Sequence, residues 1–301
     1  MRAISYYNLL IHPLLETLGG GPGCGGKYSL MPLFWLRVAV GFYGLGLLYA
    51  LLALARRHDI ISRIIMPVIG VGFVLHFVSL TEHYVNVGRL MPDSIHTSES
   101  LLAFLIMVFF TGVYIRYRTT APGIFVFPLV FLLTFSAAVG LKPPQFTSPV
   151  LRSGWIVVHV ALIFTGYAAL FFSFAASLLY LLQERTLKAK RAVGLMSRLP
   201  ALEVIDQMGY RSLLLGFPFM TFGIVAGSVI AQAEFGAHYF LDPKIVLSLL
   251  MYAVYMLLVY TRWNSGWRGR KAAYLSTFAF LAAILAWAAN YVSGVHRFIA
   301  P

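Results

Sequence analysis

Eight long apolar stretches dominate this 301-residue sequence and constrain its fold more than any other feature. Each holds roughly 20 residues, enough for a helix to cross a hydrocarbon layer of about 30 Å. Lipid offers backbone groups no hydrogen-bond partner, so only helices and closed barrels cross it, and continuous apolar runs favour helices. We therefore predict an all-α integral membrane bundle of eight transmembrane helices, at residues 33–55, 64–85, 100–117, 122–141, 153–182, 213–234, 245–262 and 272–295.

The positive charges indicate how this bundle is oriented. Of the 23 lysines and arginines, fifteen fall in the turns after the first, third, fifth and seventh stretches. Loops rich in these residues stay on the cytoplasmic side, so both termini are predicted to face outward. The net charge of +13 follows from this topology and from attraction to anionic lipid headgroups. Because the charges are scattered over short loops, no nucleic-acid partner is predicted.

The segments between the stretches are short, which leaves room for one transmembrane domain, residues 32–301. Residues 1–31 are predicted to be a flexible extension, because the Gly-rich run from Gly19 to Gly26 is incompatible with a helix. Met31 is an alternative start position, so we leave open whether residues 1–30 are native. Because Cys24 is the only cysteine, an internal disulfide, a CxxC redox pair and a Cys-ligated zinc or iron–sulfur centre are excluded.

The longest inward segment, from Glu184 to Ser212, is predicted to contain a helix that lies at the membrane interface. Its apolar residues recur at helical spacing, with basic residues clustered before them. These apolar residues are Leu195, Leu199, Leu202, Ile205 and Met208.

Histidines gather on one side of the predicted membrane. Neutral imidazole is the commonest protein ligand for a transition metal or a haem iron. The asymmetry therefore predicts a metal or haem site on the outward side. Seven of the eight histidines lie in or near the outward half: His12, His76, His83, His96, His159, His238 and His296.

The outward loop at residues 234–244 is aromatic yet leads into a helix. Such a loop suits a shelf at the interface that lies against a flat apolar ligand; the alternative is an ordinary interfacial aromatic belt. Two carboxylates, Glu234 and Asp242, bracket the loop and can hold Lys244 or a ligand histidine by hydrogen bonds.

Residues 235–245 resemble the WGxYWxWDPKE loop of the haem-handling membrane proteins of cytochrome c assembly, the CcsA/ResC and CcmC type with HemX-like relatives. Gly236 and the triplet Asp242-Pro243-Lys244 match that loop. Its three tryptophans are replaced by Phe235, Tyr239 and Leu241, and its final glutamate by Ile245. His238 stands where the family has tyrosine, and it would be an additional ligand.

Further fragments extend the resemblance over residues 33–301, and their shared order and spacing make it specific. They are Leu75-His76; the "P…ES" loop from Gly88 to Ser100 with Pro92, Glu99 and Ser100; the helix start Trp155 to Val160 with Tyr167-Ala168; Gly216-Phe217-Pro218 with Gly223 and Gly227; Gly266-Trp267-Arg268-Gly269; and Gly294-Val295-His296.

The resemblance implies an outer site for haem b. In the family, a histidine at the start of one helix and another near the C-terminus flank the aromatic loop and ligate the iron. His159 and His296 occupy these positions. The porphyrin would stand against the loop residues Phe235, Gly236, His238, Tyr239 and Asp242.

A second haem site of the family lies within the membrane, and it would use His76 here. Its other ligand, a histidine in the family, aligns with Tyr260. Tyrosinate can ligate ferric haem, whereas a neutral phenol is a poor axial ligand. His83 lies two helical turns from His76 on the same face, and it is either an alternative ligand or, like Glu82, a side chain that reaches the interface.

The resemblance implies a haem-binding component of cytochrome c biogenesis in the bacterial inner (cytoplasmic) membrane, with its site on the periplasmic side. It would present haem to the CxxCH motif of apocytochrome c, as at most the haem-handling subunit of a cytochrome c synthase, beside a second assembly subunit. Two alternatives stay open: a HemX-like accessory or regulatory protein with a relaxed site, and a transporter of haem or another solute.

Overall fold

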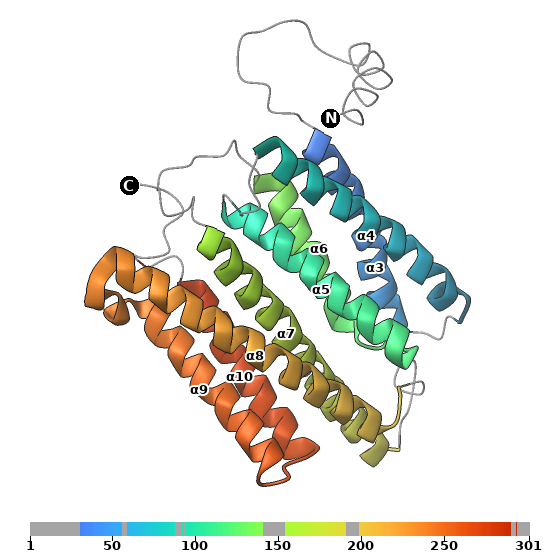
Figure 1. The fold of residues 1–301 in the computed structure, drawn as a ribbon. Helices are drawn as coiled ribbons and strands as arrows, with labels where there is room; N and C mark the ends of the chain where they lie inside the picture. Colours follow the sequence, from blue (N-terminus) through green and yellow to red (C-terminus); the bar gives the residue numbers. More distant parts are fainter. Residues whose placement is uncertain are drawn as a thin grey trace, which may run out of the picture.

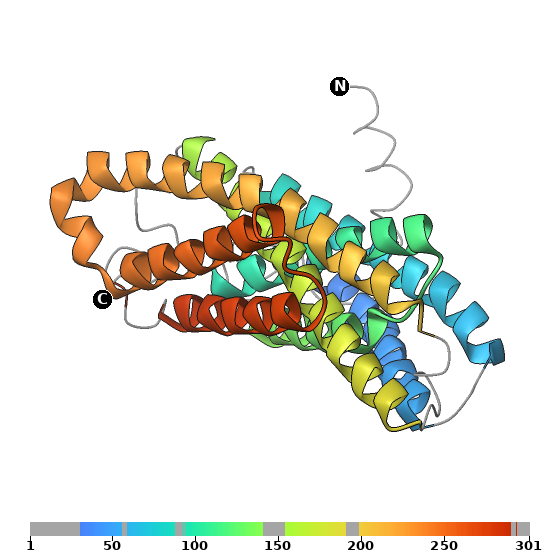
Figure 2. The same cartoon turned by 90° about the horizontal axis from the view of Figure 1, so that it is seen from below.

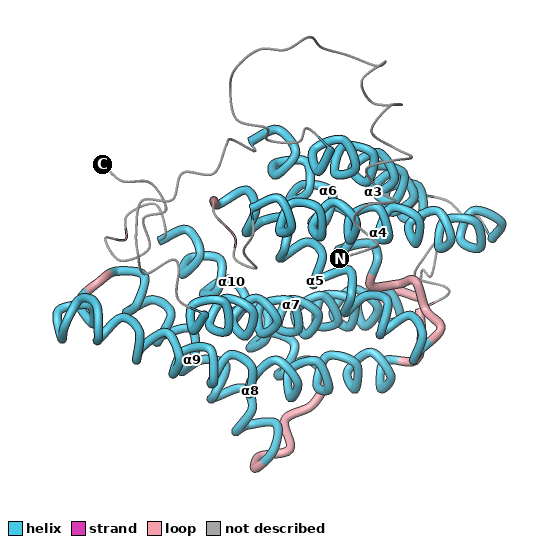
Figure 3. The backbone as a smooth tube through the Cα atoms, turned by 45° about the horizontal axis from the view of Figure 1, so that its top comes forward, coloured by secondary structure: helices cyan, strands magenta, loops and turns pink. Residues whose placement is uncertain are grey.

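The computed structural model describes residues 31–55, 59–87, 92, 94–140, 154–190, 199–289 and 293. Over these residues every regular element is a helix (Figure 3), and eight helices are long and apolar enough to cross a membrane. The predicted all-α fold and number of spans are therefore confirmed. The predicted flexible extension lies outside the described residues apart from Met31, which opens the first helix.

The eight helices form two halves that meet along the middle of the molecule (Figure 1). The first half packs α3 against α4 and α6, and α5 against α6; in the second half α7 packs against α8 and α10, and α9 against α10. Helix α7 also packs against α5, which joins the halves. The helices are α3 (Met31–Ala55), α4 (Asp59–Val87), α5 (Ile95–Tyr117), α6 (Gly123–Gly140), α7 (Gly154–Lys188), α8 (Leu202–Phe235), α9 (Pro243–Trp263) and α10 (Arg270–Ala288), with a 3-10 helix, η3 (Gly236–Leu241), between α8 and α9.

A seam of small residues brings α7 and α8 together. Three glycines of α8, Gly209, Gly216 and Gly223, recur every seven residues and all face α7. A Cβ at Gly216 would lie 2.9 Å from Ala169 Cβ, so a larger residue would force the two backbones apart. Small residues at such spacing let membrane helices approach closely where lipid supplies no hydrophobic drive for association.

The side chains that face away from the bundle are apolar, as lipid requires. On α8, Phe222, Val225 and Val229 recur at helical spacing with exposed fractions of 56–66%. The core has two clusters: one contains Tyr43 and Phe127 and extends from the first half onto α7 and the start of α8, and the other contains Met251 and lies within the second half. Helices with apolar surfaces on every side are those of a membrane span.

Two predicted boundaries need correction. The predicted interfacial helix within 184–212 is wrong as a separate element, because α8 runs continuously from Leu202 to Phe235. Its apolar positions Ile205 and Met208 are buried in the core; Leu195 lies outside the described residues. The predicted outward loop that ends at Ser100 also stops earlier, because Ser94 caps α5 through a reciprocal capping box with Thr97.

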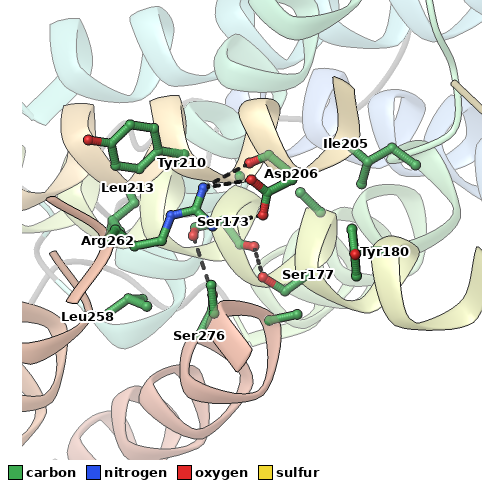
Figure 4. A pocket seen from close by; sticks show the side chains of 14 residues that line it. Ser173, Ser177, Tyr180, Ile205, Asp206, Tyr210, Leu213, Leu258, Arg262 and Ser276 are labelled. Atoms are coloured by element: carbon green, nitrogen blue, oxygen red, sulfur yellow. Dashed lines mark hydrogen bonds and ion pairs between the residues drawn. The ribbon is translucent and has the colours of Figure 1, made fainter. Parts of the chain in front are cut away.

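At the end of the bundle away from η3, an ion pair ties three elements together (Figure 4). Arg262 of α9 donates to both carboxylate oxygens of Asp206 of α8, at 2.7 and 3.1 Å. The backbone amide of Gly269, which precedes α10, donates to the same carboxylate at 3.1 Å. The guanidinium also lies 4.7 Å from the ring centroid of Tyr210. This network fixes α8, α9 and the turn into α10.

Candidate functional site

The aromatic loop predicted from the sequence is a short 3-10 segment, η3, which reverses the chain between α8 and α9 (Figure 2). Gly236 ends α8 with φ +63° and ψ −166°, and its amide donates to the carbonyl of Gln232. Within the turn Tyr239 is buried, whereas Phe240 is exposed; their ring centroids lie 4.1 Å apart. The turn thus presents the ring of Phe240, backed by the buried Tyr239, at one end of the bundle.

Asp242 joins this turn to its neighbours. It is the N-cap of α9, and its Oδ1 accepts from the backbone amide of Lys244 at 2.9 Å. The hydroxyl of Ser293, which lies beyond the end of α10, is 2.9 Å from each carboxylate oxygen and donates to them. Both side chains are buried. A charge-assisted contact of this kind is stronger than one between neutral groups.

His159, the predicted ligand on α7, rests in a notch of α8. Its Nδ1 lies 2.7 Å from the carbonyl oxygen of Gly223, and because a carbonyl only accepts, Nδ1 carries the proton. A Cβ at Gly227 would lie 2.6 Å from that nitrogen, so the ring occupies space that any other residue would fill. A histidine that donates from one nitrogen presents the lone pair of the other to a metal.

The described part of the site therefore comes from α7, α8, η3 and the start of α9. Gly227 and Gly236 are nine residues apart, which is roughly 14 Å along a helix. Lys244, in the first turn of α9, is half-buried. Among the other predicted site residues, Phe235 ends α8 and His238 lies within η3. The side chains of Glu234, Phe235 and His238, and all of His296, lie outside the described residues.

His76, the residue predicted for a second haem site, is fully buried in the other half of the bundle. Its Nε2 lies 2.9 Å from the hydroxyl of Ser100 on α5, and its Nδ1 lies 3.3 Å from the hydroxyl of Tyr43 on α3. The ring also packs edge-on against Phe104. Each ring nitrogen therefore has a hydroxyl partner, and His76 of α4 links α3 to α5.

The structure does not bring His76 and Tyr260 together. Helices α4 and α9 lie on opposite sides of the molecule (Figure 1). Tyr260 is 58% exposed, and its hydroxyl accepts from the side chain of Asn264 at 2.9 Å. Further along α4, Glu82 and His83 are half-buried, and the His83 ring lies edge-on to Tyr84.

Three residues that shape the site could not be assigned a role from the sequence. Gly223 and Gly227 are motif residues, but nothing in the motif indicates that they form the seat of His159. Ser293 carries no signal of its own, although it directly precedes the Gly-Val-His fragment that contains His296. The role of Glu99 in the "P…ES" fragment also becomes clear, since it accepts from the hydroxyl of Ser136 at 2.7 Å within the helix pair α5–α6.

Comparison with known proteins decides the family. A family model described as Cytochrome C assembly protein matches residues 42–296, which is most of the chain and includes both halves of the bundle. The chain belongs to this family. As a cytochrome c assembly protein with eight apolar helices, it is a multi-pass membrane protein.

Named relatives agree with the family. A protein named cytochrome c biogenesis protein CcsA from Pyropia yezoensis is 25% identical over 317 residues, which cover 91% of this chain and 94% of the relative. A CcsA from Chlamydomonas reinhardtii is 29% identical over 234 residues, covering 73% and 63%. Protein HemX from Brevibacillus brevis is 32% identical over 154 residues, covering 51% and 57%.

Replacing Gly236 by alanine is expected to destabilise the η3 turn of this cytochrome c assembly protein. Among the described residues, no atom lies within 4 Å of a Cβ at this position, so the cost comes from the backbone. Its φ of +63° and ψ of −166° form a conformation that is essentially open only to glycine and costs other residues about 1–3 kcal/mol. Thermal unfolding in detergent measures the loss. Gly41→Ala, a helical glycine that also has open space around it, is the control, and an equal melting temperature for both variants would contradict the expected strain.

Replacing His76 by alanine is expected to lower stability while leaving the site beside η3 intact. The change removes the partner of two hydroxyls and opens a cavity in a closed core, which costs about 2–5 kcal/mol. Unfolding of the purified protein measures the stability, and the haem content of the folded fraction measures the site. If the folded variant instead bound one haem fewer per protein than the wild type, His76 would be a ligand of a second haem.

Proposed function

We propose that this protein binds haem b at the η3 end of the bundle, with His159 as an axial ligand, and presents it to apocytochrome c for covalent attachment. The observation that carries the proposal is the hydrogen bond from His159 Nδ1 to the Gly223 carbonyl. It fixes the tautomer and leaves Nε2 to bind iron. Family membership supports the wider role in cytochrome c biogenesis.

The residues around His159 suit haem as a cargo. The exposed ring of Phe240 on η3 offers an apolar contact to a porphyrin. His296 is the proposed second axial ligand, since the family resemblance assigns that position to its C-terminal fragment. The basic residues of the turns at the other end of the bundle support an outward-facing site, on the periplasmic side if the membrane is a bacterial inner membrane.

The covalent chemistry belongs to the substrate in this proposal. The two thiols of a CxxCH motif add across the two vinyl groups of haem, and each addition transfers a thiol hydrogen to the vinyl carbon. This chain has one cysteine, Cys24, so the nucleophiles come from the apocytochrome. The protein would hold and orient haem, as the haem-handling subunit of a synthase with a second membrane subunit as its partner.

A HemX-like accessory or regulatory role is the second candidate. The similarity to Protein HemX from Brevibacillus brevis favours it, as does the replacement of the family's three loop tryptophans by Phe235, Tyr239 and Leu241. Weak haem binding, or none, would distinguish this role from haem delivery.

The test of delivery is covalent attachment in living cells. The protein is expressed with its partner subunit and a reporter apocytochrome in a host that lacks its own cytochrome c assembly system. We expect reporter protein with covalently bound haem from the wild type, and a loss of about 100-fold from His159→Ala, because the variant lacks an axial ligand to the iron. Equal reporter haem with and without the protein would overturn delivery and favour the accessory role.

A further inference from the structure

We infer that the start of α10 is a binding site for one anionic phospholipid, with Arg270 and Lys271 as the groups that hold its phosphate. The site lies at the end of the bundle away from η3 and does not depend on haem. Four observations carry the inference: the turn before α10 is held in one conformation, the two cations rest on aromatic rings, positive charge there is in excess, and an apolar stripe continues from the cations along α10.

Hydrogen bonds hold the turn between α9 and α10 in one conformation. The backbone amide of Trp267 donates to the carbonyl of Thr261 at 3.1 Å, which folds the turn back over the end of α9. The backbone amide of Gly269 donates to the carboxylate of Asp206 on α8, also at 3.1 Å. The residues that follow this turn therefore keep a fixed position relative to the bundle, and a site that is formed before its ligand arrives binds more tightly.

The two cations rest on aromatic rings. The guanidinium carbon of Arg270 lies 5.5 Å from the ring centroid of Tyr274, and its Nη2 donates to the tyrosine hydroxyl at 3.3 Å. The ammonium of Lys271 lies 5.7 Å from the ring centroid of Trp267. Such contacts orient a cation but do not cancel its charge. Because a guanidinium has five N–H donors and an ammonium has three, most of these donors stay available to a phosphate.

Positive charge at this turn is in excess. The sequence contains no aspartate or glutamate after Asp242. Four basic residues lie at the turn, and over the part of the chain that the structure describes Arg262 is the only one of them in an ion pair, with Asp206. Glu184, at the end of the neighbouring α7, pairs with Lys188 at 2.7 Å. The three other basic residues of the turn are exposed: Arg268, Arg270 and Lys271.

An apolar stripe on α10 continues directly from these cations. Phe278, Leu281 and Leu285 follow Tyr274 at spacings of four, three and four residues, so all four share one helix face, and all four are exposed. Arg270 lies one turn before Tyr274 on the same face. The face therefore presents a charged end followed by an apolar length, the order of a phospholipid with its phosphate at Arg270 and its acyl chains along the helix.

The exposed aromatic side chains agree with this depth in the membrane. Trp263, at the end of α9, is 79% exposed, and Trp267 and Tyr274 are exposed beside it. Tryptophan and tyrosine gather where hydrocarbon meets the headgroups. Basic residues in a cytoplasmic turn are expected in any multi-pass protein; the fixed turn, the aromatic supports and the apolar stripe are what favour one bound lipid over a diffuse attraction.

The test is the binding of phosphatidylglycerol to the full-length protein after purification and removal of lipid, measured by native mass spectrometry and thermal unfolding. We expect phosphatidylglycerol to bind and to raise the melting temperature, and phosphatidylcholine, which has no net charge, to bind more weakly. Arg270→Ala and Lys271→Ala should each weaken the binding of the tightest phosphatidylglycerol about fivefold, the effect of one basic residue near a lipid surface.

Arg116→Ala is the matched control. Arg116, in the last turn of α5, also lies 5.5 Å from a tyrosine ring centroid, that of Tyr117, so the variant loses the same charge from another helix end. It should keep the wild-type affinity for phosphatidylglycerol. Arg270→Lys retains the charge but loses the planar arrangement of donors, and its affinity should fall between those of the wild type and Arg270→Ala.

Three results would overturn the site. The first is equal affinity for phosphatidylglycerol in the wild type, Arg270→Ala and Lys271→Ala. The second is an equal loss in Arg116→Ala, which would reveal a general effect of surface charge. The third is equal stabilisation by inorganic phosphate and by phosphatidylglycerol, because the acyl chains would then contribute nothing. None of these measurements involves haem, so the proposed function stands or falls separately.

Discussion

Replacing Gly227 by alanine is expected to remove haem about as effectively as replacing His159 itself. The added methyl group would lie 2.6 Å from His159 Nδ1, so the ring has to leave its notch and lose the hydrogen bond to the Gly223 carbonyl. The imidazole would then lose both its orientation and its fixed tautomer. We expect a fall in haem affinity of about 10- to 100-fold, measured by haem titration of the purified protein.

Gly112→Ala is the matched control for this experiment. Gly112 is also a helical glycine, but no atom of the described residues lies within 4 Å of a Cβ there. Alanine has a higher helix propensity than glycine by about 1 kcal/mol, so this variant should be at least as stable as the wild type and should keep its haem. If Gly227→Ala also kept full affinity, the notch would not be what positions His159.

Replacing Asp206 by alanine is expected to have the largest effect on stability. It leaves the guanidinium of Arg262, whose side chain is 7% exposed, without its carboxylate partner, and it removes the acceptor of the Gly269 amide. Breaking a buried ion pair by removing one partner typically costs about 3–5 kcal/mol. Thermal and denaturant unfolding in detergent should show this loss, together with a lower yield of folded protein.

Glu184→Ala tests whether any carboxylate at this end would give the same result. Glu184 pairs with Lys188 one helical turn away at 2.7 Å, and the lysine is 66% exposed. Exposed pairs of this type contribute little, so the melting temperature should hardly change. Similar losses in Asp206→Ala and Glu184→Ala would contradict the role given to the buried network.

The fold was largely predictable because membrane helices are specified by length and apolarity. The sequence predicted eight spans, and the described residues contain eight that overlap them, although the span of α8 begins at Leu202 and not at residue 213. The main error concerned an apolar face. The helical spacing of Ile205 and Met208 was interpreted as an interfacial surface, yet both residues belong to α8 and their side chains are buried. A single sequence does not show which neighbour covers an apolar face.

The candidate site was predictable in its residue types but not in its hydrogen bonds. The histidine pattern and the loop motif predicted His159 and Asp242. That a carbonyl of α8 fixes the His159 tautomer, and that Ser293 binds Asp242, depends on contacts between residues 51 or more positions apart. For His76, the family resemblance predicted a ligand of a second site, which stays a prediction; the structure adds that a hydroxyl lies beside each ring nitrogen.

The most direct test of haem ligation at the η3 end is an absorption spectrum of the purified protein supplied with haem, wild type beside His159→Ala and His76→Ala. Ligation by His159 predicts a Soret band with sharp reduced α and β bands in the wild type and in folded His76→Ala, and the loss or shift of these bands in His159→Ala. A wild type without haem, or a His159→Ala spectrum identical to that of the wild type, would contradict it.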